Sequence, residues 1–428
     1  MSVGAGPSRG AERQRAAAEK IVSVLRESGC TAYLAGGCVR DMLLGWTPKD
    51  YDVATDATPD RVVSLFRRTV LVGEAFGVAL VRLMGCEVEV ATFRIEWGYS
   101  DRRRPDHVAF TDAAHDARRR DFTINGLFYD PIERAVIDYV EGRADLEAGR
   151  VRAIGDPGQR FAEDYLRMLR AVRFAARLGF EIEPRTRRAI EKEAPRLGLI
   201  SRERIGGEMR QMLTAVTRVR AAELCQSLAL DAPALDDEFL PGGAAMLGEM
   251  PVDAGFALAL AAWACDRAVN RAGSGATARS AVEGIDVERL VDRWRAALAL
   301  SNDDRDRLAS LLSRLPAALD WATLATAGRK RLIARAEWAD LAALARAFGR
   351  VHGGFNEAAF EAEVARLEAE GVCPAPLVTG DDLIALGMKP GPVFKDVLEA
   401  VYDAQLEGRV AEREGAMAMV RSMVGAGE

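Results

Sequence analysis

The stretch Gly36-Gly37-Cys38-Val39-Arg40-Asp41, followed closely by Asp50-Tyr51-Asp52, decides the expected fold of this 428-residue chain. A short apolar run at residues 31–35 precedes the glycines and residues 39–44 have a helical pattern, so the glycines form a strand-to-helix turn. Glycine lets backbone amides approach a phosphate closely, and a helix N-terminus favours negative charge. Arg40 can add a charge-assisted hydrogen bond. The pattern predicts a phosphate-binding turn, although a plain strand–turn–helix has the same appearance.

Two carboxylates, Asp50 and Asp52, follow this turn in a run that reads as a strand over residues 51–54. Side chains two residues apart in a strand share a face, and neighbouring carboxylates repel each other unless a cation lies between them. A pair of divalent ions plays this role in nucleotidyl transfer, and Mg²⁺ prefers oxygen ligands. The spacing predicts that Asp50 and Asp52 bind metal; the alternative is a solvated strand end.

Two glutamates supply a further candidate ligand. Residues 78–83 and 87–93 alternate apolar and polar side chains about Gly85, which predicts a hairpin. Glu87 and Glu89 lie among valines on its second strand. Either could complete the metal site if that strand lies beside the aspartate strand, or both could face outward.

A charged segment, Arg119–Asn125, comes later in the chain. Its adjacent basic and acidic residues, such as Arg120 and Asp121, suit recognition of a ribose and a phosphate. A surface ion cluster is the alternative interpretation.

The segment Glu163–Arg173 is expected to be helical. Positions three apart on a helix are neighbours, so Asp164, Arg167 and Arg170 form one polar track. Carboxylate acceptors and guanidinium donors together can read the pairing edge of a base without a template. Arg173 falls almost opposite Asp164, so spacing alone makes Arg173 an RNA-facing or structural residue. An ordinary salt-bridged face is the alternative for the whole track.

The pattern around these motifs separates two regions of the chain. Residues 13–28 predict a helix that ends at Gly29, and Thr58-Pro59-Asp60 is typical of a helix start. Residues 20–150 mix helices and strands, whereas strand signals nearly vanish after about residue 155. We predict an α+β head with a small mixed sheet and helices, followed by an all-α region.

Composition and charge fit a protein that binds RNA on one side. The net charge is −6, but basic residues gather at 102–120 and 160–220, whereas 230–255 is mostly acidic. The six cysteines form no close pairs and there are three histidines, which argues against zinc and histidine-rich metal centres. No apolar run suits a membrane helix or a secretory signal, so we expect a cytoplasmic protein without membrane contact.

Taken together, these residues resemble the class II tRNA nucleotidyltransferase and bacterial poly(A) polymerase family. The first four matching motifs span about residues 30–215, and a fifth resembles the tail of bacterial tRNA nucleotidyltransferases. In chain order the motifs are Gly36–Gly45 with Asp50-Tyr51-Asp52, Arg119–Asn125, the nucleotide-reading segment Glu163–Arg173, the helix-stabilising segment Ser201–Ile205, and Gly380–Leu383 with Gly387–Pro392.

The resemblance implies a head, neck, body and tail arrangement. After a disordered start at residues 1–12, the catalytic nucleotidyltransferase head is expected at 13–154. A helical neck at 155–220 would read the nucleotide and bind RNA. A helical body at 221–371 and a helical, tRNA-binding tail at 372–428 would follow.

The implied activity is template-independent addition of CCA to the 3′ end of tRNA from CTP and ATP. It would proceed by two-metal nucleotidyl transfer with Mg²⁺ and release of pyrophosphate. The expected partners are tRNA, ATP and CTP, and no protein partner is indicated. A poly(A) polymerase or a partial C- or A-adding enzyme on the same scaffold is the alternative. A third possibility, an inactive RNA-binding protein, conflicts with the presence of Asp50, Asp52, Asp164 and Arg167.

The resemblance also assigns roles to individual residues. Asp50 and Asp52 would be catalytic metal ligands, with Glu89 as a third catalytic acid. The implied nucleotide-binding residues are Gly36, Gly37, Arg40, Arg120 and Asp121 around the triphosphate and sugar, Asp164 and Arg167 at the base, and Arg170 and Arg173 as supports.

Three positions depart from the family pattern. Cys38 stands where a smaller residue is usual, Gly126 where alanine is commoner, and Arg103 replaces a frequent glycine in residues 101–105. The last segment influences the switch from C to A addition in the family. The resemblance therefore supports catalysis more strongly than synthesis of the full CCA end.

Overall fold

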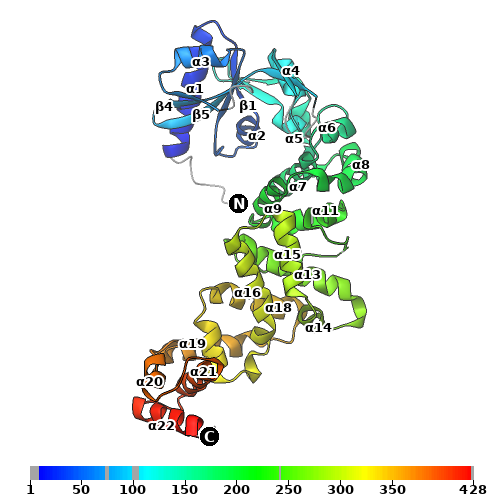
Figure 1. The fold of residues 1–428 in the computed structure, drawn as a ribbon. Coiled ribbons are helices and arrows are strands. Elements are labelled where there is room, and N and C mark those ends of the chain that lie inside the picture. The colour runs from blue at the N-terminus through cyan, green and yellow to red at the C-terminus, as the bar shows by residue number, and fades with distance from the viewer. Residues whose placement is uncertain (1–8, 73–76, 99–105, 241, 426–428) are drawn as a thin grey trace. The chain divides into compact units, whose positions relative to one another are not determined.

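The structure is a computed structural model that describes residues 9–72, 77–98, 106–240 and 242–425 (Figure 1). The chain forms two compact units, residues 1–239 with 297–299, and residues 240–296 with 300–428. All predicted catalytic and nucleotide-binding residues belong to the first unit. The finer boundaries of head, neck, body and tail stay predictions, and the departure at Arg103 lies outside the described residues.

A seven-stranded mixed sheet forms the centre of the head, with strand order β3-β4-β5-β2-β1-β8-β9. β2 and β5 run parallel, and the other five neighbouring pairs run antiparallel. β4 and β5 are the predicted hairpin. The strands of this sheet are β1 (Ala32–Ala35), β2 (Asp52–Thr55), β3 (Thr69–Leu71), β4 (Val78–Leu83), β5 (Cys86–Thr92), β8 (Leu127–Asp130) and β9 (Ala135–Asp138).

Two small sheets accompany it. An antiparallel pair joins β6 (Arg94–Trp97) to β7 (His107–Phe110). A parallel pair joins β10 (Arg150–Val151) to β11 (Glu181–Ile182), so a short strand lies among the helices after residue 155.

Helix α1 (Arg9–Glu27) packs against β1, β2 and β5. It begins four residues before the predicted start, so the expectation of a disordered start at 1–12 is wrong for residues 9–12. Glu12 lies in the first turn, where its negative charge interacts favourably with the helix dipole, and alanines nearby favour helix. Residues 1–8 lie outside the described part of the chain.

The other head helices are short. α3 is capped by Thr58, which accepts a hydrogen bond from Arg61 N, as its Thr-Pro-Asp start predicts. The helices are α2 (Gly37–Leu43), α3 (Pro59–Leu65), α4 (Ala113–Arg118), α5 (Gly142–Glu147) and the 3₁₀ turn η2 (Thr123–Asn125).

A buried cluster fixes the strands that carry the site. Phe93 and Phe128 pack edge to face with ring centroids 5.9 Å apart, against Ala35 and Ala54. Burial of such apolar side chains contributes roughly 1.5–3 kcal/mol each. The cluster therefore holds β1, β2 and β8 in a fixed arrangement.

Apart from β11 and the connecting segments, the rest of the first unit is helical, and α7 is its central element. α7 packs against α9 and α10, and it ends at Gly179, whose φ of 73° is left-handed. Phe174 on α7 meets Phe122 of the head edge to face at 5.8 Å. The helices are α6 (Pro157–Glu163), α7 (Leu166–Leu178), α8 (Pro184–Glu193), η3 (Ala194–Leu199), α9 (Arg202–Leu213), α10 (Arg218–Ser227) and α11 (Asp231–Leu235).

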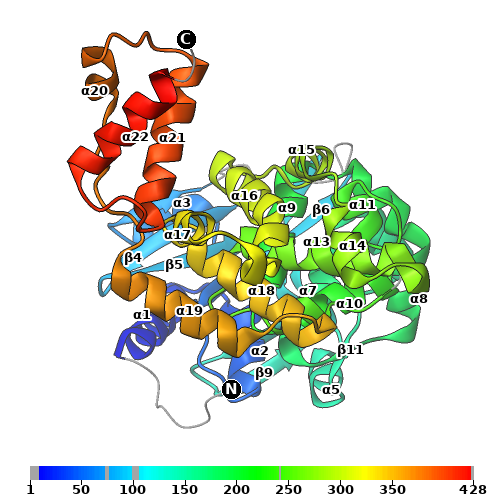
Figure 2. The ribbon, with the colours of Figure 1, turned by 90° about the horizontal axis from the view of Figure 1, so that it is seen from below.

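The remaining described residues contain helices and no strands, as the sequence predicts. α13, which is almost wholly buried, packs against α16, and α20–α22 form a compact group with their own apolar cluster (Figure 2). No described helix has the length and apolarity that crossing a membrane requires. The helices are α12 (Ala245–Gly248), α13 (Phe256–Ala272), η4 (Gly273–Gly275), α14 (Ala278–Glu283), α15 (Val287–Leu298), α16 (Asn302–Leu319), η5 (Trp321–Thr323), α17 (Thr326–Ile333), α18 (Trp338–His352), α19 (Glu357–Glu370), α20 (Gly380–Ala385), α21 (Pro392–Leu406) and α22 (Arg413–Gly425).

Candidate active site

Gly36, between β1 and α2, and Gly37, the first residue of α2, border a pocket of about 520 Å³ in the first unit. Gly36 has a left-handed φ of 74°, and a Cβ at this position would lie 2.7 Å from Nη1 of Arg120. Glycine is therefore required both by the backbone conformation and by the close approach of the arginine. The strand–turn–helix that the sequence predicts is present, and both glycines line the pocket.

The carboxylates lie on the neighbouring strands. β2 begins at Asp52, and its parallel register with β5 pairs Val53 with Val90, which brings Asp52 beside Glu89. Both acids line the pocket. Asp50 is exposed and lies just before β2, outside the strand and outside the pocket lining.

Glu87 and Glu89 have different environments, and these show which of the two lies near Asp52. Glu87 forms an ion pair with Arg82 across the hairpin, and its backbone oxygen accepts a hydrogen bond from Gln14. Glu89 lines the pocket instead. Of the two, Glu89 is thus the one that lies near Asp52.

The charge around Asp52 favours a cation. Desolvation by surrounding protein, together with repulsion from Glu89 and Asp50, raises the pKa of Asp52 to about 6, although Arg120 opposes the shift. In the described part of the chain, no three or more His, Cys, Asp or Glu side chains gather closely enough to hold a metal ion by themselves. Mg²⁺ is commonly held by one or two carboxylates, waters and substrate phosphates, so this acid pair fits that ion.

Two arginines are fixed at the glycine turn. Arg120 donates to both Asp116, through Nε at 3.2 Å and Nη2 at 3.0 Å, and the backbone oxygen of Asn125. Arg40 is buried, pairs with Asp41, and donates from Nη1 to Oδ1 of Asn125 at 2.5 Å. Held guanidinium groups lose little conformational entropy on binding a phosphate.

Asp121 is engaged by protein partners. Arg170 donates to Oδ2 of Asp121 from Nε at 2.9 Å and from Nη2 at 2.7 Å, and Asn125 donates to Oδ1. Burial by itself would raise the pKa of Asp121, but Arg170 and the hydrogen bonds from Asn125 and Phe122 lower it to about 2. Asp121 therefore fastens α7 to the head at the pocket wall.

The predicted helical track is interrupted at its first member. α6 ends at Glu163, and Asp164 has extended backbone angles of φ −156° and ψ 101° before α7 begins. Asp164 accepts from Leu166 N and receives two bonds from Arg204 on α9, at 3.1 and 2.6 Å. The expectation of one continuous helix is thus wrong, because Asp164 terminates α6 and accepts from the first turn of α7.

Arg167 and Arg170 nevertheless line the same pocket as Asp164. Nη1 of Arg167 donates to the backbone oxygen of Arg160 at 2.7 Å and to Glu163. This positions one end of the guanidinium group and leaves Nε and Nη2 as donors.

Arg173 has a different environment. It donates from Nε to Oε2 of Glu208 on α9 at 2.6 Å and lies 4.6 Å from the centre of the Phe174 ring. It does not line the pocket. This agrees with the structural alternative that helical spacing leaves open, and any support for the nucleotide would be indirect.

The pocket thus gathers most of the predicted set and adds others. A volume of about 520 Å³ suits a small-molecule ligand. Asn125 and Arg204 lie in the predicted motifs Arg119–Asn125 and Ser201–Ile205 but had no assigned contact; Asp116, the partner of Arg120, gave no signal in the sequence. The predicted residues that line the pocket are Gly36, Gly37, Arg40, Asp52, Glu89, Arg120, Asp121, Asp164, Arg167 and Arg170.

Comparison with known families identifies two segments. Residues 32–152 match the model described as "Poly A polymerase head domain". Residues 179–230 match the one described as "Probable RNA and SrmB- binding site of polymerase A".

Known proteins match over longer spans. A CCA-adding enzyme of Limosilactobacillus fermentum is 35% identical over 405 residues, covering 92% of this chain and 93% of its own. A CCA-adding enzyme of Bacillus pumilus is 46% identical over 223 residues, 51% of this chain and 56% of its own. The crystal structure of the Bacillus stearothermophilus CCA-adding enzyme in complex with CTP superimposes with a TM-score of 0.73 and 27% identity. That match covers 96% of this chain and 98% of the other.

Proposed function

Because this chain belongs to the family of CCA-adding enzymes, we propose that it adds C, C and A to the 3′ end of tRNA from CTP and ATP. The enzyme would work without a nucleic-acid template and release pyrophosphate at each step. The observation that carries the proposal is one pocket lined by Asp52 and Glu89 on the sheet, by Asp164 just before α7 and by Arg167 in the first turn of α7. The acidic residues proposed for nucleotidyl transfer and the polar residues proposed for base recognition thus line one pocket of ligand size.

The triphosphate would lie against the glycine turn. Gly36 and Gly37 leave room for phosphate oxygens, and the fixed guanidinium groups of Arg40 and Arg120 neutralise their charge. The 3′-hydroxyl oxygen of the RNA forms a bond to the α-phosphorus while the bond to the pyrophosphate breaks. The hydroxyl proton is lost to solvent, and pyrophosphate leaves with the electron pair.

Asp50 and Asp52 would hold Mg²⁺, with Glu89 as a third acid near Asp52. Two bound ions would lower the pKa of the attacking hydroxyl and stabilise the charge on the leaving pyrophosphate. The raised pKa of Asp52 supports this role, because a nearby cation would relieve the repulsion among the three carboxylates.

Base selection follows from the groups that remain unused. A carboxylate has about four acceptor positions, two on each oxygen. In Asp164, Oδ1 accepts two hydrogen bonds and Oδ2 accepts one, so one acceptor position on Oδ2 remains for a base. Cytosine and adenine both present an exocyclic amine, whereas uracil and guanine present a carbonyl oxygen there. Asp164 would accept from the amine, and Arg167 would donate to the adjacent ring nitrogen.

A poly(A) polymerase, or an enzyme that adds C or A alone, is the alternative on the same scaffold. The test is to incubate the protein with tRNA that lacks its CCA end, with CTP and ATP together or singly, and to sequence the products. Complete CCA ends support the proposal. Long A tracts would support the poly(A) alternative, and products that stop at CC or add A alone would indicate a partial enzyme. Because tRNA, CTP and ATP meet in the cytoplasm, we propose that compartment for the activity.

A further inference from the structure

Phe174, on α7, lies at the centre of a group of arginines in the first unit. It is 5% exposed and lines the nucleotide pocket. The guanidinium carbons of three arginines lie over its ring, at 5.1 Å from the ring centre for Arg40, 5.4 Å for Arg170 and 4.6 Å for Arg173. The face of an aromatic ring carries partial negative charge and attracts cations within about 6 Å. One ring thus contacts an arginine of the glycine turn in the head and two arginines of α7.

In the part of the chain that the structure describes, this group of arginines has fewer carboxylate partners than positive charges. Arg177, one turn after Phe174, also belongs to the group. Oδ2 of Asp41 accepts from Nη2 of Arg177 at 3.1 Å, while Oδ1 of Asp41 lies 2.6 Å from Nη2 of Arg40. Four guanidinium groups thus share three carboxylates as ion-pair partners, and the aromatic face supplies attraction that these acids do not. The arginines are Arg40, Arg170, Arg173 and Arg177, and the acids are Asp41, Asp121 and Glu208.

Arg40 is the member of the group that is most removed from water. It is 3% exposed, and a buried cation keeps its charge only where protein groups replace the water around it. Desolvation lowers the pKa of Arg40, although Asp41 opposes the shift. Asp41 and Asn125 engage three of its five N–H groups, which leaves one donor on Nη1 and one on Nη2 for a ligand in the pocket.

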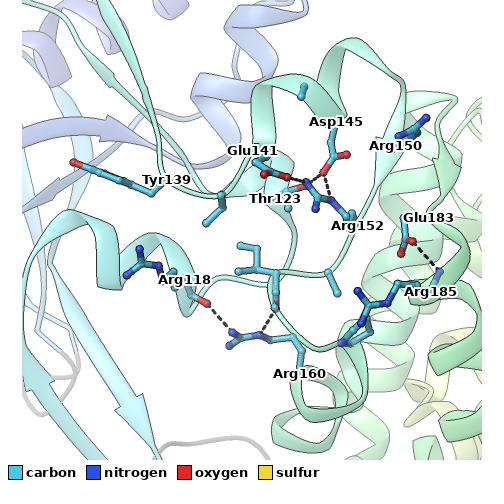
Figure 3. Close-up of a pocket in the computed structure, with 16 residues that line it drawn as sticks. Arg118, Thr123, Tyr139, Glu141, Asp145, Arg150, Arg152, Arg160, Glu183 and Arg185 are labelled. Carbon is cyan, nitrogen blue, oxygen red and sulfur yellow. Dashed lines mark hydrogen bonds and ion pairs between the residues drawn. The ribbon is translucent and has the colours of Figure 1, made fainter.

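The Asn125 partner of Arg40 is anchored independently of α7. It ends the 3₁₀ turn η2, whose first residue, Thr123, faces a separate cavity of about 930 Å³ (Figure 3). There Oγ1 of Thr123 donates to Asp145 at 2.7 Å, and Nε of Arg152 donates to the same carboxylate at 2.6 Å. Replacement of Phe174 therefore removes the ring from beneath Arg40 and leaves Asn125 in place.

We propose that Phe174 is a positioning residue for the triphosphate, because its ring holds the guanidinium group of Arg40 in the orientation that binds phosphate. Phe174 acts through Arg40 and touches no reacting atom. It also joins the phosphate end of the pocket to α7, the helix that carries Arg167. The proposal rests on the proposed function, which assigns the triphosphate to the glycine turn, and it adds the residue that keeps the phosphate-binding arginine in place.

The test weakens the negative face of the ring in steps while keeping its shape. Phenylalanine with one, two or three fluorine atoms is placed at position 174 of the full chain, because fluorine draws electron density away from the ring face. Phe174→Leu removes the ring altogether. Phe161 receives the same replacements as a control, since it is fully buried on α6 and no guanidinium group of a described residue lies over its ring. Binding of inorganic tripolyphosphate with Mg²⁺ is measured by calorimetry, and KM and kcat for CTP and ATP are measured on tRNA lacking CCA.

Loss of a buried cation–π contact changes an equilibrium by about 5- to 30-fold. Apparent affinity falls with the fraction of molecules in which Arg40 is held for binding. We therefore expect the Kd of tripolyphosphate to rise about 5- to 30-fold in Phe174→Leu and roughly 2- to 3-fold for each fluorine atom at position 174. KM should rise by the same factor for CTP and for ATP, because both carry the same phosphates, so the preference between them stays constant. The replacements at Phe161 should leave these values unchanged.

Three results would overturn the proposal. One is the absence of a graded change on fluorination of Phe174, which would make the ring a packing group alone even if Phe174→Leu is impaired or unfolded. The second is an unequal change in KM for CTP and ATP, which would assign the ring to base recognition. The third is failure of the unaltered protein to bind tripolyphosphate. A protein that binds tripolyphosphate but does not extend tRNA would count against the proposed function alone, because calorimetry measures binding without turnover.

Discussion

Arg204 offers a direct test of the proposed base selection, because it donates to Asp164, the carboxylate that we propose accepts from the base. Its two donors meet both oxygens of Asp164, at 3.1 and 2.6 Å. Arg204→Lys keeps the positive charge but can supply one directed bond instead of a planar pair. Arg202→Lys is the matched control, since Arg202 lies on the same helix and donates to the backbone oxygen of Pro233.

The expected magnitude follows from the lost bond. A hydrogen bond to a charged group contributes about 1.5–3 kcal/mol, which corresponds to roughly 10- to 150-fold in a rate or equilibrium ratio. Asp164 that is free to rotate no longer presents its remaining acceptor position to an exocyclic amine. We therefore expect the preference for CTP over UTP in kcat/KM to fall by about that factor for Arg204→Lys. In Asp164→Ala, the preference for CTP over UTP should fall by at least the same factor.

The assay is steady-state incorporation of CMP and UMP into tRNA lacking CCA, with thermal unfolding to confirm that each variant is folded. Arg202→Lys should retain the original preference. The reasoning is refuted if Arg204→Lys keeps full preference for CTP while Asp164→Ala loses it. In that case Asp164 would be positioned by its backbone and by Leu166 N.

Three further outcomes are expected. Asp50→Ala and Asp52→Ala should each nearly abolish incorporation while tRNA binding survives; near-normal turnover in both would exclude a metal role. Removal of residues 372–428 should weaken tRNA binding strongly but leave incorporation into a short RNA much less affected, and a truncated protein that completes tRNA normally would exclude the tail from recognition. Burial raises the pKa of Asp266 to about 7 from an ordinary 3.8, so the folded state favours the protonated carboxyl group. The contribution of this group to the stability of the fold is therefore present at acidic pH and is lost as pH rises through about 7. Stability should fall by roughly 2–3 kcal/mol between pH 5 and 8. Asp266→Asn, which still accepts from Met246 N, should flatten that fall in chemical unfolding.

The sequence predicts the head well at turns whose backbone conformation only glycine adopts readily. Gly36 has a left-handed φ and an arginine against it, and Gly85 follows the positive φ of Met84 in the predicted hairpin. Both are turns that glycine signals directly. Strand pairing brings Asp52 beside Glu89. The sequence alone does not distinguish Glu87 from Glu89 as the acid near Asp52, because both alternate with valines on the same strand.

Side-chain partners over long separations were not predictable. The sequence spacing suggests a helix through Asp164, but a bidentate bond from Arg204, 40 residues later, accompanies an extended backbone there. Asp121 lines the pocket, but its spacing in the sequence does not indicate that Arg170, 49 residues later, bonds its carboxylate. Helical spacing correctly left Arg173 open to a structural role, and Glu208 is its partner. Local periodicity carries no information about which distant helix supplies a counter-charge.

The parallel pairing of β2 with β5 has a consequence for how the protein is made. The strands are connected through α3, β3 and β4, so the two carboxylates meet after this crossover has closed. Arg204 also lines the pocket and lies roughly 170 residues after Ala35, another lining residue. At about 5–20 residues per second, a ribosome needs on the order of 10–30 s between these two residues. During that interval a growing chain has its glycine turn and first acids without the arginine that bonds Asp164. Under the proposed function, nucleotide selection would therefore begin only after α9 has been synthesised.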